Sequence, residues 1–178
     1  MTGLSSTYHG VATRLEGMDW LIPTLARFLF AAILLVYFLN AGMTKLRDGI
    51  SGLWSPTSAY AQIFPRAFDA AGYDTDAMSI WHWLVAITGT WTEFVLPALI
   101  VLGFLTRIAS LGMIGFVALQ SLTDVYGFGR LDEIGAWFDR FPDSAIMDQR
   151  GLWIFLLLVL VIKGAGPLSF DRALCPRQ

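Results

Sequence analysis

Long apolar stretches constrain this chain more than any other feature. Four of them approach the roughly 20 residues that a helix needs to cross a membrane: residues 20–42, 80–104, 107–126 and 151–166. Polar and apolar residues do not alternate within them, which argues against a transmembrane barrel. The chain is 56% hydrophobic and only 15% charged, whereas soluble domains are about 25% charged. We therefore predict an all-α integral membrane four-helix bundle, with residues 1–178 as a single domain.

The composition also excludes several classes of protein. The aromatic content of 14% is too high for a disordered chain. The one cysteine, Cys175, can support neither a disulfide scaffold nor dithiol redox chemistry. A net charge of -2 gives no basic surface for nucleic acid. Because His9 and His82 are the only histidines, the two axial ligands of a haem within the bundle are missing, and a metal site is not expected either.

The connections between the stretches are uneven in length. Residues 44–79 are too polar to span a membrane, and Pro56 is well placed to begin a short helix that Pro65 would bend or end. Residues 127–150 carry aromatic and aliphatic residues at helical spacing among acids. We predict short interfacial helices in both segments, although ordered loops packed on the bundle remain an alternative. The apolar positions are Ala59, Ile63 and Phe64 in the first segment and Ile134, Trp137, Phe138 and Phe141 in the second.

Four spans place both termini on one side of the membrane, and basic residues indicate which side. The two sides carry nearly equal numbers, but the terminal side holds Arg107 in a very short turn, which favours cytoplasmic termini. The terminal side has Arg14, Arg107, Lys163, Arg172 and Arg177. The loop side has Lys45, Arg47, Arg66, Arg130, Arg140 and Arg150.

Two ionisable residues lie deep within the predicted spans, where charged groups are costly and commonly functional. Arg27 lies about 10 Å into the first span, and Glu93 lies about 20 Å into the second from the opposite face, at about 1.5 Å per residue. We expect the two to form an ion pair. This pair could simply hold two helices together, or Glu93 could handle protons with a pKa that burial and Arg27 set.

A second polar group is predicted near the loop-side ends of the spans. Its members are Asn40, Lys45, His82, Gln120 and Asp124, of which the last two share a helix face. Together they could line a pocket for a quinone headgroup, with an apolar slot for its tail. Ordinary solvation of span ends is the alternative.

Small residues and tryptophans form two further patterns in the spans. Small residues in the second and third spans are expected to allow close helix packing: Thr88, Gly89, Gly112 and Gly115. Tryptophans at span ends are typical of an interfacial aromatic belt: Trp20, Trp54, Trp81, Trp83 and Trp153.

Three motifs follow one another in the spans. AGMTKL ends the first span, LIVLGFLTR closes the second, and KGAGPLSFDRAL follows the fourth. Together they resemble the DoxX family of small four-helix bacterial membrane proteins, and the resemblance covers roughly residues 24–174. It implies a bundle in the bacterial cytoplasmic membrane, and relatives are associated with quinone-linked oxidoreductases. Many members carry a histidine near the end of the third span, where this chain has Gln120 or Asp124. The functional positions that the resemblance implies are Arg27, Lys45, Glu93, Arg107 and Gln120.

These observations leave three hypotheses for function. In the first, the chain is a quinone-binding subunit of a membrane oxidoreductase, with Glu93 as proton carrier, Arg27 tuning it, and Lys45 and Gln120 contacting the quinone. In the second, it is a non-catalytic scaffold subunit whose loop aromatics contact a partner. The third, a small transporter or lipid-handling protein, has the least support, since four spans are few for alternating access. A membrane or peripheral redox subunit, or a second copy of the chain, is the expected partner, and whether the chain is an enzyme stays open.

Overall fold

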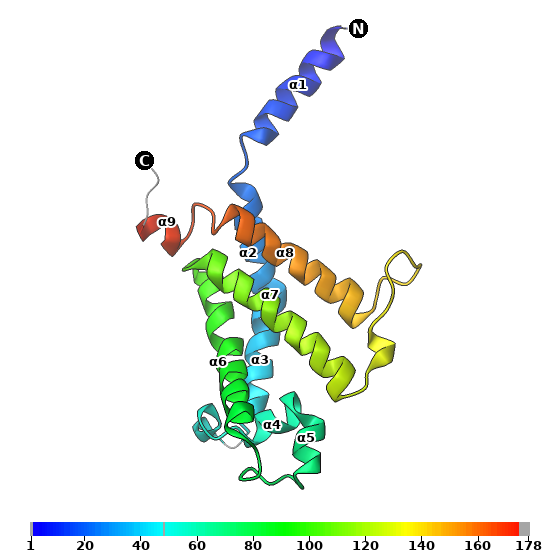
Figure 1. The fold of residues 1–178 in the computed structure, drawn as a ribbon. Coiled ribbons are helices and arrows are strands. Elements are labelled where there is room, and N and C mark those ends of the chain that lie inside the picture. The colour runs from blue at the N-terminus through cyan, green and yellow to red at the C-terminus, as the bar shows by residue number, and fades with distance from the viewer. Residues whose placement is uncertain (1, 48, 175–178) are drawn as a thin grey trace.

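The computed structural model describes residues 2–47 and 49–174, which are largely helical (Figure 1). Helix α1 (Thr2–Glu16) projects away from the rest of the molecule and was not predicted. The remaining helices form a bundle whose terminal end carries α9 (Phe170–Leu174) and whose opposite end carries the loop helices α4 (Thr57–Ile63) and α5 (Pro65–Ala70). We call these the terminal end and the loop end.

Four helical segments within the described residues are long and apolar enough to cross a membrane: Leu21–Lys45, Ile80–Leu102, Thr106–Gly127 and Ala145–Lys163. The fold class is therefore confirmed. The fourth segment begins six residues earlier than expected (145 against 151), because a π-helical turn precedes α8. In order, the segments contain α2 (Leu21–Leu29), a π-turn (Phe30–Leu35) and α3 (Val36–Lys45); α6 (Ile80–Leu102); α7 (Thr106–Leu122) with a π-turn (Thr123–Gly127); and a π-turn (Ala145–Gln149) with α8 (Arg150–Lys163).

The helices pack in sequence around a common core. Helix α7 lies along both α6 and α8, α3 lies along α6, and α2 lies along α8. The α3–α6 pair and the α7–α8 pair separate toward the loop end (Figure 1). The core lies where the four segments are close together, and its fully buried side chains include Phe30, Leu34, Phe38, Ile100, Met113, Val117, Leu157 and Leu160.

Large apolar side chains cover the outside of the bundle. Ile33, Val36, Leu111 and Phe155 are each at least 60% exposed. In water such a surface would be unfavourable, but lipid tails are as apolar as leucine, so helix association in a membrane depends on packing and hydrogen bonds instead. The exposed surface therefore fits a lipid bilayer environment.

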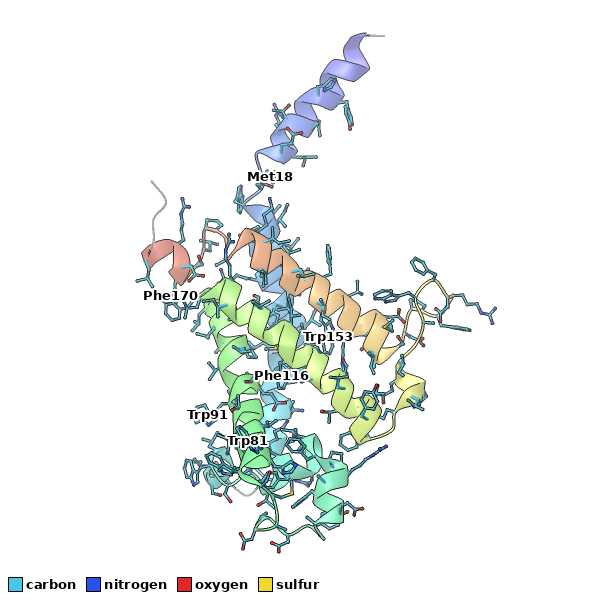
Figure 2. All side chains as sticks on the ribbon, viewed as in Figure 1. Met18, Trp81, Trp91, Phe116, Trp153 and Phe170 are labelled. Carbon is cyan, nitrogen blue, oxygen red and sulfur yellow. The ribbon has the colours of Figure 1, made fainter. Side chains whose placement is uncertain are left out.

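The predicted aromatic belt is only partly present. Trp20, Trp54 and Trp81 are exposed near span ends. Trp153 instead packs against the buried Phe38, with ring centroids 6.1 Å apart, and points into the bundle rather than the interface (Figure 2).

The two connecting segments differ in how well they were predicted. In the first, α4 ends at Ile63 and α5 starts at Pro65, as the sequence indicated, and Ala59 is buried against Ala86 of α6. In the second, the predicted interfacial helix is wrong. Gly135 and Phe138 have φ angles of 72° and 66°, whereas an α-helix needs about −63°. Residues 134–144 therefore form a loop that exposes Trp137, Phe138 and Phe141.

A short turn joins α6 to α7 at the terminal end. Helix α6 ends two residues earlier than predicted because Gly103 adopts the left-handed conformation, with a φ of 70°. The carboxylate of Asp171 accepts hydrogen bonds from the backbone N–H groups of Leu105 (2.7 Å) and Thr106 (3.0 Å). Burial opposes ionisation of Asp171, but these bonds and the charge of Arg27 outweigh it, so the pKa of Asp171 lies below its ordinary value. The ionised carboxylate thereby caps the start of α7.

Candidate functional site

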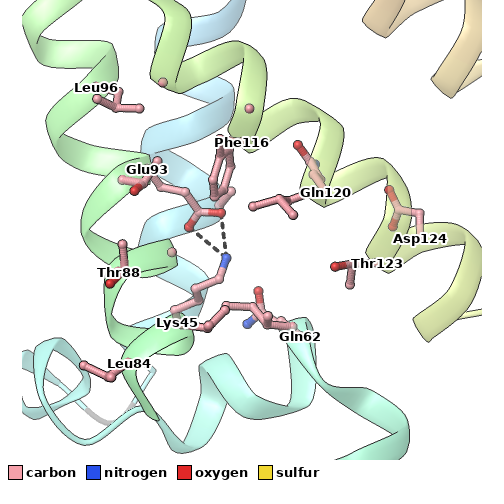
Figure 3. Close-up of a pocket in the computed structure, with 18 of the residues that line it drawn as sticks. Lys45, Gln62, Leu84, Thr88, Glu93, Leu96, Phe116, Gln120, Thr123 and Asp124 are labelled. Carbon is pink, nitrogen blue, oxygen red and sulfur yellow. Dashed lines mark hydrogen bonds and ion pairs between the residues drawn. The ribbon is translucent and has the colours of Figure 1, made fainter. Parts of the chain in front are cut away.

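A buried ion pair joins the first two spans. The ammonium Nζ of Lys45, the last residue of α3, lies 2.7 Å and 2.8 Å from the two carboxylate oxygens of Glu93 in α6 (Figure 3). The side chains are only 7% and 6% exposed. The two opposite charges neutralise each other, and ionised groups within a membrane span are commonly paired in this way.

The pair lies in the wall of a pocket between α6 and α7, in the space where the helix pairs separate. The pocket has a volume of about 780 Å³, and its lining at the loop end includes Gln62 and Ile63 of α4. Residues of α6 at i, i+4 spacing, including Val85, Gly89 and Glu93, line one side. Along α7, Gly112, Gly115, Phe116, Leu119 and Gln120 line the other side (Figure 3).

The pocket opens sideways between the helices. Leu84, Val85 and Leu119 line it and are each at least 40% exposed. Because these residues belong to membrane-spanning helices, the opening faces the region that lipid tails occupy. A molecule could therefore reach the buried pair from the lipid phase.

Polar groups of α7 complete the pocket. The amide Nε2 of Gln120 donates to the hydroxyl of Tyr37 (2.6 Å), while its Oε1 is buried with no hydrogen-bond partner among the described residues. One carboxylate oxygen of Asp124 is bound by the buried Arg150, which also donates to the hydroxyl of Ser121 (2.9 Å). The other oxygen lies 3.6 Å from a guanidinium nitrogen of Arg130. The pocket thus combines apolar walls with a few fixed polar groups, as small-molecule sites do.

The structure brings together only some of the predicted site residues. Lys45, Glu93, Gln120 and Asp124 all line the pocket, but His82 and Asn40 do not. The ring nitrogen Nδ1 of His82 accepts a hydrogen bond from the backbone N–H of Ser79 (3.3 Å), and the ring packs edge-on against Phe64. Its role is therefore to cap α6. Asn40 is exposed on α3, because the turns of that helix direct Ala41 and Lys45 to the pocket instead.

The predicted Arg27–Glu93 ion pair is wrong. The guanidinium of Arg27 donates instead to four backbone carbonyls, those of Ile100 (3.1 Å) and Val101 in α6 and of Ala165 (2.9 Å) and Leu168 after α8. The last turn of a helix leaves carbonyls without intrahelical partners, and Arg27 lies level with that turn of α6. Arg27 is therefore a terminal-end capping residue and does not line the pocket.

Several pocket residues were missed or misread in the sequence. Arg150 and Arg130 were counted only as loop charges, although an arginine at the very start of an apolar stretch, as Arg150 is, could have signalled a buried partner. Close packing at Gly112 is as the sequence indicates, since a Cβ there would lie 3.1 Å from the Leu96 side chain of α6. Gly115 differs, because a Cβ there would meet nothing within 4 Å and the glycine leaves open space in the pocket wall.

These features define a four-span α-helical membrane protein with a laterally open pocket and a buried ion pair in its wall. The chain belongs to the DoxX family, whose model matches residues 22–123. The match includes Lys45, Glu93 and Gln120 and ends one residue before Asp124. No curated protein and no solved structure matches the chain.

Proposed function

We propose that this DoxX-family protein binds a lipid-soluble quinone in the pocket between α6 and α7 and serves a quinone-linked oxidoreductase. The observation that carries the proposal is the Lys45–Glu93 pair, which lies in the wall of an otherwise largely apolar pocket. A pair that only held helices together would not need about 780 Å³ of open space beside it. That volume lies within the range of about 300–1,000 Å³ that is typical of small-molecule sites.

The chemistry of the pocket suits a quinone headgroup. A quinone carries two carbonyl oxygens that accept hydrogen bonds, and the ammonium of Lys45 is a donor within the pocket. Gln120 lies on the facing helix and can contact the second side of a ring placed between α6 and α7 (Figure 3). The isoprenoid tail would leave through the lateral opening beside Leu84 and Leu119.

The ion pair can also serve proton transfer. Reduction of a quinone to a quinol takes up two electrons and two protons, and the carboxylate of Glu93 can hold and release a proton beside the headgroup. Lys45, rather than Arg27, is the cation that pairs with Glu93. The electrons would be supplied by a partner membrane or peripheral redox subunit.

A substitution at Gly115, which lines the pocket, tests the proposal. Gly115→Leu is expected to raise the dissociation constant for a short-chain ubiquinone analogue at least about tenfold, a loss of about 1.4 kcal/mol, because the new side chain occupies the pocket. The measurement is quenching of tryptophan fluorescence by the quinone, with the purified chain in lipid nanodiscs, since Trp81 lies at the pocket.

Gly151→Leu is the matched control for this substitution. Gly151 lies in α8 away from the pocket, and a Cβ there also meets nothing within 4 Å, so its quinone affinity should stay within about twofold of the original. Equal affinities for Gly115→Leu and the unchanged chain would contradict a quinone site in this pocket.

A scaffold role is the second candidate. It is favoured by the exposed loop aromatics Trp137, Phe138 and Phe141, which the rest of the described chain leaves uncovered. A scaffold would retain a partner protein through gentle purification, and its quinone affinity would be negligible with or without Gly115→Leu. The two candidates therefore give different results in the same nanodisc experiment.

We further propose that the protein lies in the bacterial inner membrane with its termini in the cytoplasm. Lys45 and Arg150 at the loop end are buried and paired with Glu93 and Asp124, so they add little to the charge that decides orientation. Cys175, the only cysteine, lies outside the described residues and comes directly after α9 in the sequence. A membrane-impermeant maleimide is expected to label it only after the cytoplasmic membrane is permeabilised. Labelling in intact spheroplasts would show the opposite orientation, with the termini outside the cytoplasm.

A further inference from the structure

A second hollow lies at the terminal end, far from the buried ion pair. It has a volume of about 700 Å³. It lies where the first and third spans begin and the fourth span finishes, and the segment after the fourth span completes it. Three cations line it from three different elements: Arg107 at the start of α7, Lys163 at the end of α8, and Arg172 in α9. The proposed quinone site uses none of these residues.

Two of these cations are free to bind a ligand. Asp171 also lines the hollow, but its oxygens accept hydrogen bonds from the backbone at the start of α7. Asp19 pairs with Lys163 at 3.2 Å. The guanidinium groups of Arg107 and Arg172, in contrast, form no hydrogen bond or ion pair with any residue that the structure describes, and both residues are exposed. The hollow therefore has two guanidinium groups without an ion-pair partner, and its three cations outnumber its two carboxylates.

The surroundings of the hollow are apolar on the side of the spans. Leu105 and Ile108 line it and are 47% and 70% exposed, and Trp20 lines it at the start of the first span. Phe170, between the lining residues Ser169 and Asp171 in the sequence, is exposed on α9 (Figure 2). Exposed tryptophan and aliphatic side chains next to arginines are typical of the boundary between headgroups and lipid tails. A small water-soluble anion would make no contact that requires these exposed apolar side chains.

We propose that the hollow binds the phosphodiester headgroup of an anionic phospholipid, with Arg107 and Arg172 on the phosphate and the acyl chains along Ile108. Guanidinium groups are suited to phosphate because their planar array of donors can bind two oxygens at once. Basic pockets between the ends of spans are a known form of anionic-lipid site. The proposal is independent of whether the other pocket binds a quinone.

The test compares lipid retention by native mass spectrometry of the purified full chain. The unchanged chain is expected to bind phosphatidylglycerol in preference to phosphatidylcholine. The double variant Arg107→Gln/Arg172→Gln should weaken phosphatidylglycerol binding about twenty- to thirtyfold, since each basic residue near an anionic lipid contributes about fivefold. Both side chains are exposed, so the variant should keep its unfolding temperature.

Two controls make the result decisive. Arg47→Gln/Arg140→Gln removes the same charge from exposed positions at the loop end and should leave phosphatidylglycerol binding unchanged. Inorganic phosphate at millimolar concentration should fail to displace the lipid, because it lacks the acyl chains. The proposal is overturned if the terminal-end variant binds phosphatidylglycerol normally, if the loop-end variant loses as much, or if phosphate alone displaces the lipid.

Discussion

Lys45→Met alone is expected to lower the free energy of unfolding by about 3 kcal/mol, the cost of removing one partner from a buried ion pair. The substitution leaves the carboxylate of Glu93 buried without its cation, in a helix surrounded by lipid. Glu93→Gln in the same chain is expected to restore most of the loss, because a neutral amide needs no counter-charge. Lys45 and Glu93 should therefore show a coupling energy of at least about 1 kcal/mol in a double-mutant cycle.

Chemical unfolding in mixed micelles measures the four chains of this cycle. The unchanged chain, the two single variants and the double variant should all insert, because none removes an apolar residue from a span. If Lys45→Met and Glu93→Gln changed the free energy of unfolding additively, the result would contradict the ion pair seen in the structure.

Arg27→Met should cause a loss of similar size for a different reason. The substitution removes one hydrogen bond from each of four carbonyl oxygens, two in the last turn of α6 and two in the segment after α8. Of these, the carbonyl of Ile100 keeps a hydrogen bond from the backbone N–H of Gly103. A hydrogen bond to a charged group contributes about 1.5–3 kcal/mol, and solvation of the freed carbonyls at the span end offsets part of this, which leaves an expected loss of about 3–5 kcal/mol. Arg27→Lys should recover less than half, since a single ammonium cannot span the four carbonyls.

A second double-mutant cycle separates Arg27 from the ion pair. Because Arg27 caps the terminal end and makes no contact with Glu93, Arg27→Met and Glu93→Gln should be additive within about 0.5 kcal/mol. The same unfolding assay serves both cycles. A coupling as large as that between Lys45 and Glu93 would mean that Arg27 does act on Glu93, as the sequence alone had suggested.

The four spans could be predicted because hydrophobic length is a property of each segment alone. Helix α4 could be predicted for a similar reason, since Pro56 and Pro65 restrict the backbone locally. The loop after α7 could not, because helical spacing of its aromatics is compatible with a helix but does not enforce one. The left-handed backbone at Phe138 is decided by how the loop closes between two spans.

The candidate site could be predicted in part. The sequence places Glu93 within a span, and a carboxylate buried there needs a cation as its partner. Which cation provides it depends on the rotation and crossing of α3 and α6, and on where α6 ends. Depth alone made Arg27 a candidate partner. Its guanidinium instead donates to the carbonyls of Ile100 and Val101 in the last turn of α6, whereas the ammonium of Lys45, at the end of α3, reaches Glu93. Periodicity shows that Gln120 and Asp124 share a face, but it could not show that Asn40 and His82 face elsewhere.

The most direct test of a quinone site between α6 and α7 is photolabelling of the membrane-embedded chain with a photoreactive quinone analogue, followed by peptide mass spectrometry. We expect adducts within residues 84–96 of α6 and 112–124 of α7. Excess unlabelled quinone should suppress them, and Gly115→Leu should reduce them. Adducts spread over the lipid-facing side chains, such as Phe155 of α8, and insensitive to unlabelled quinone would contradict the proposed site.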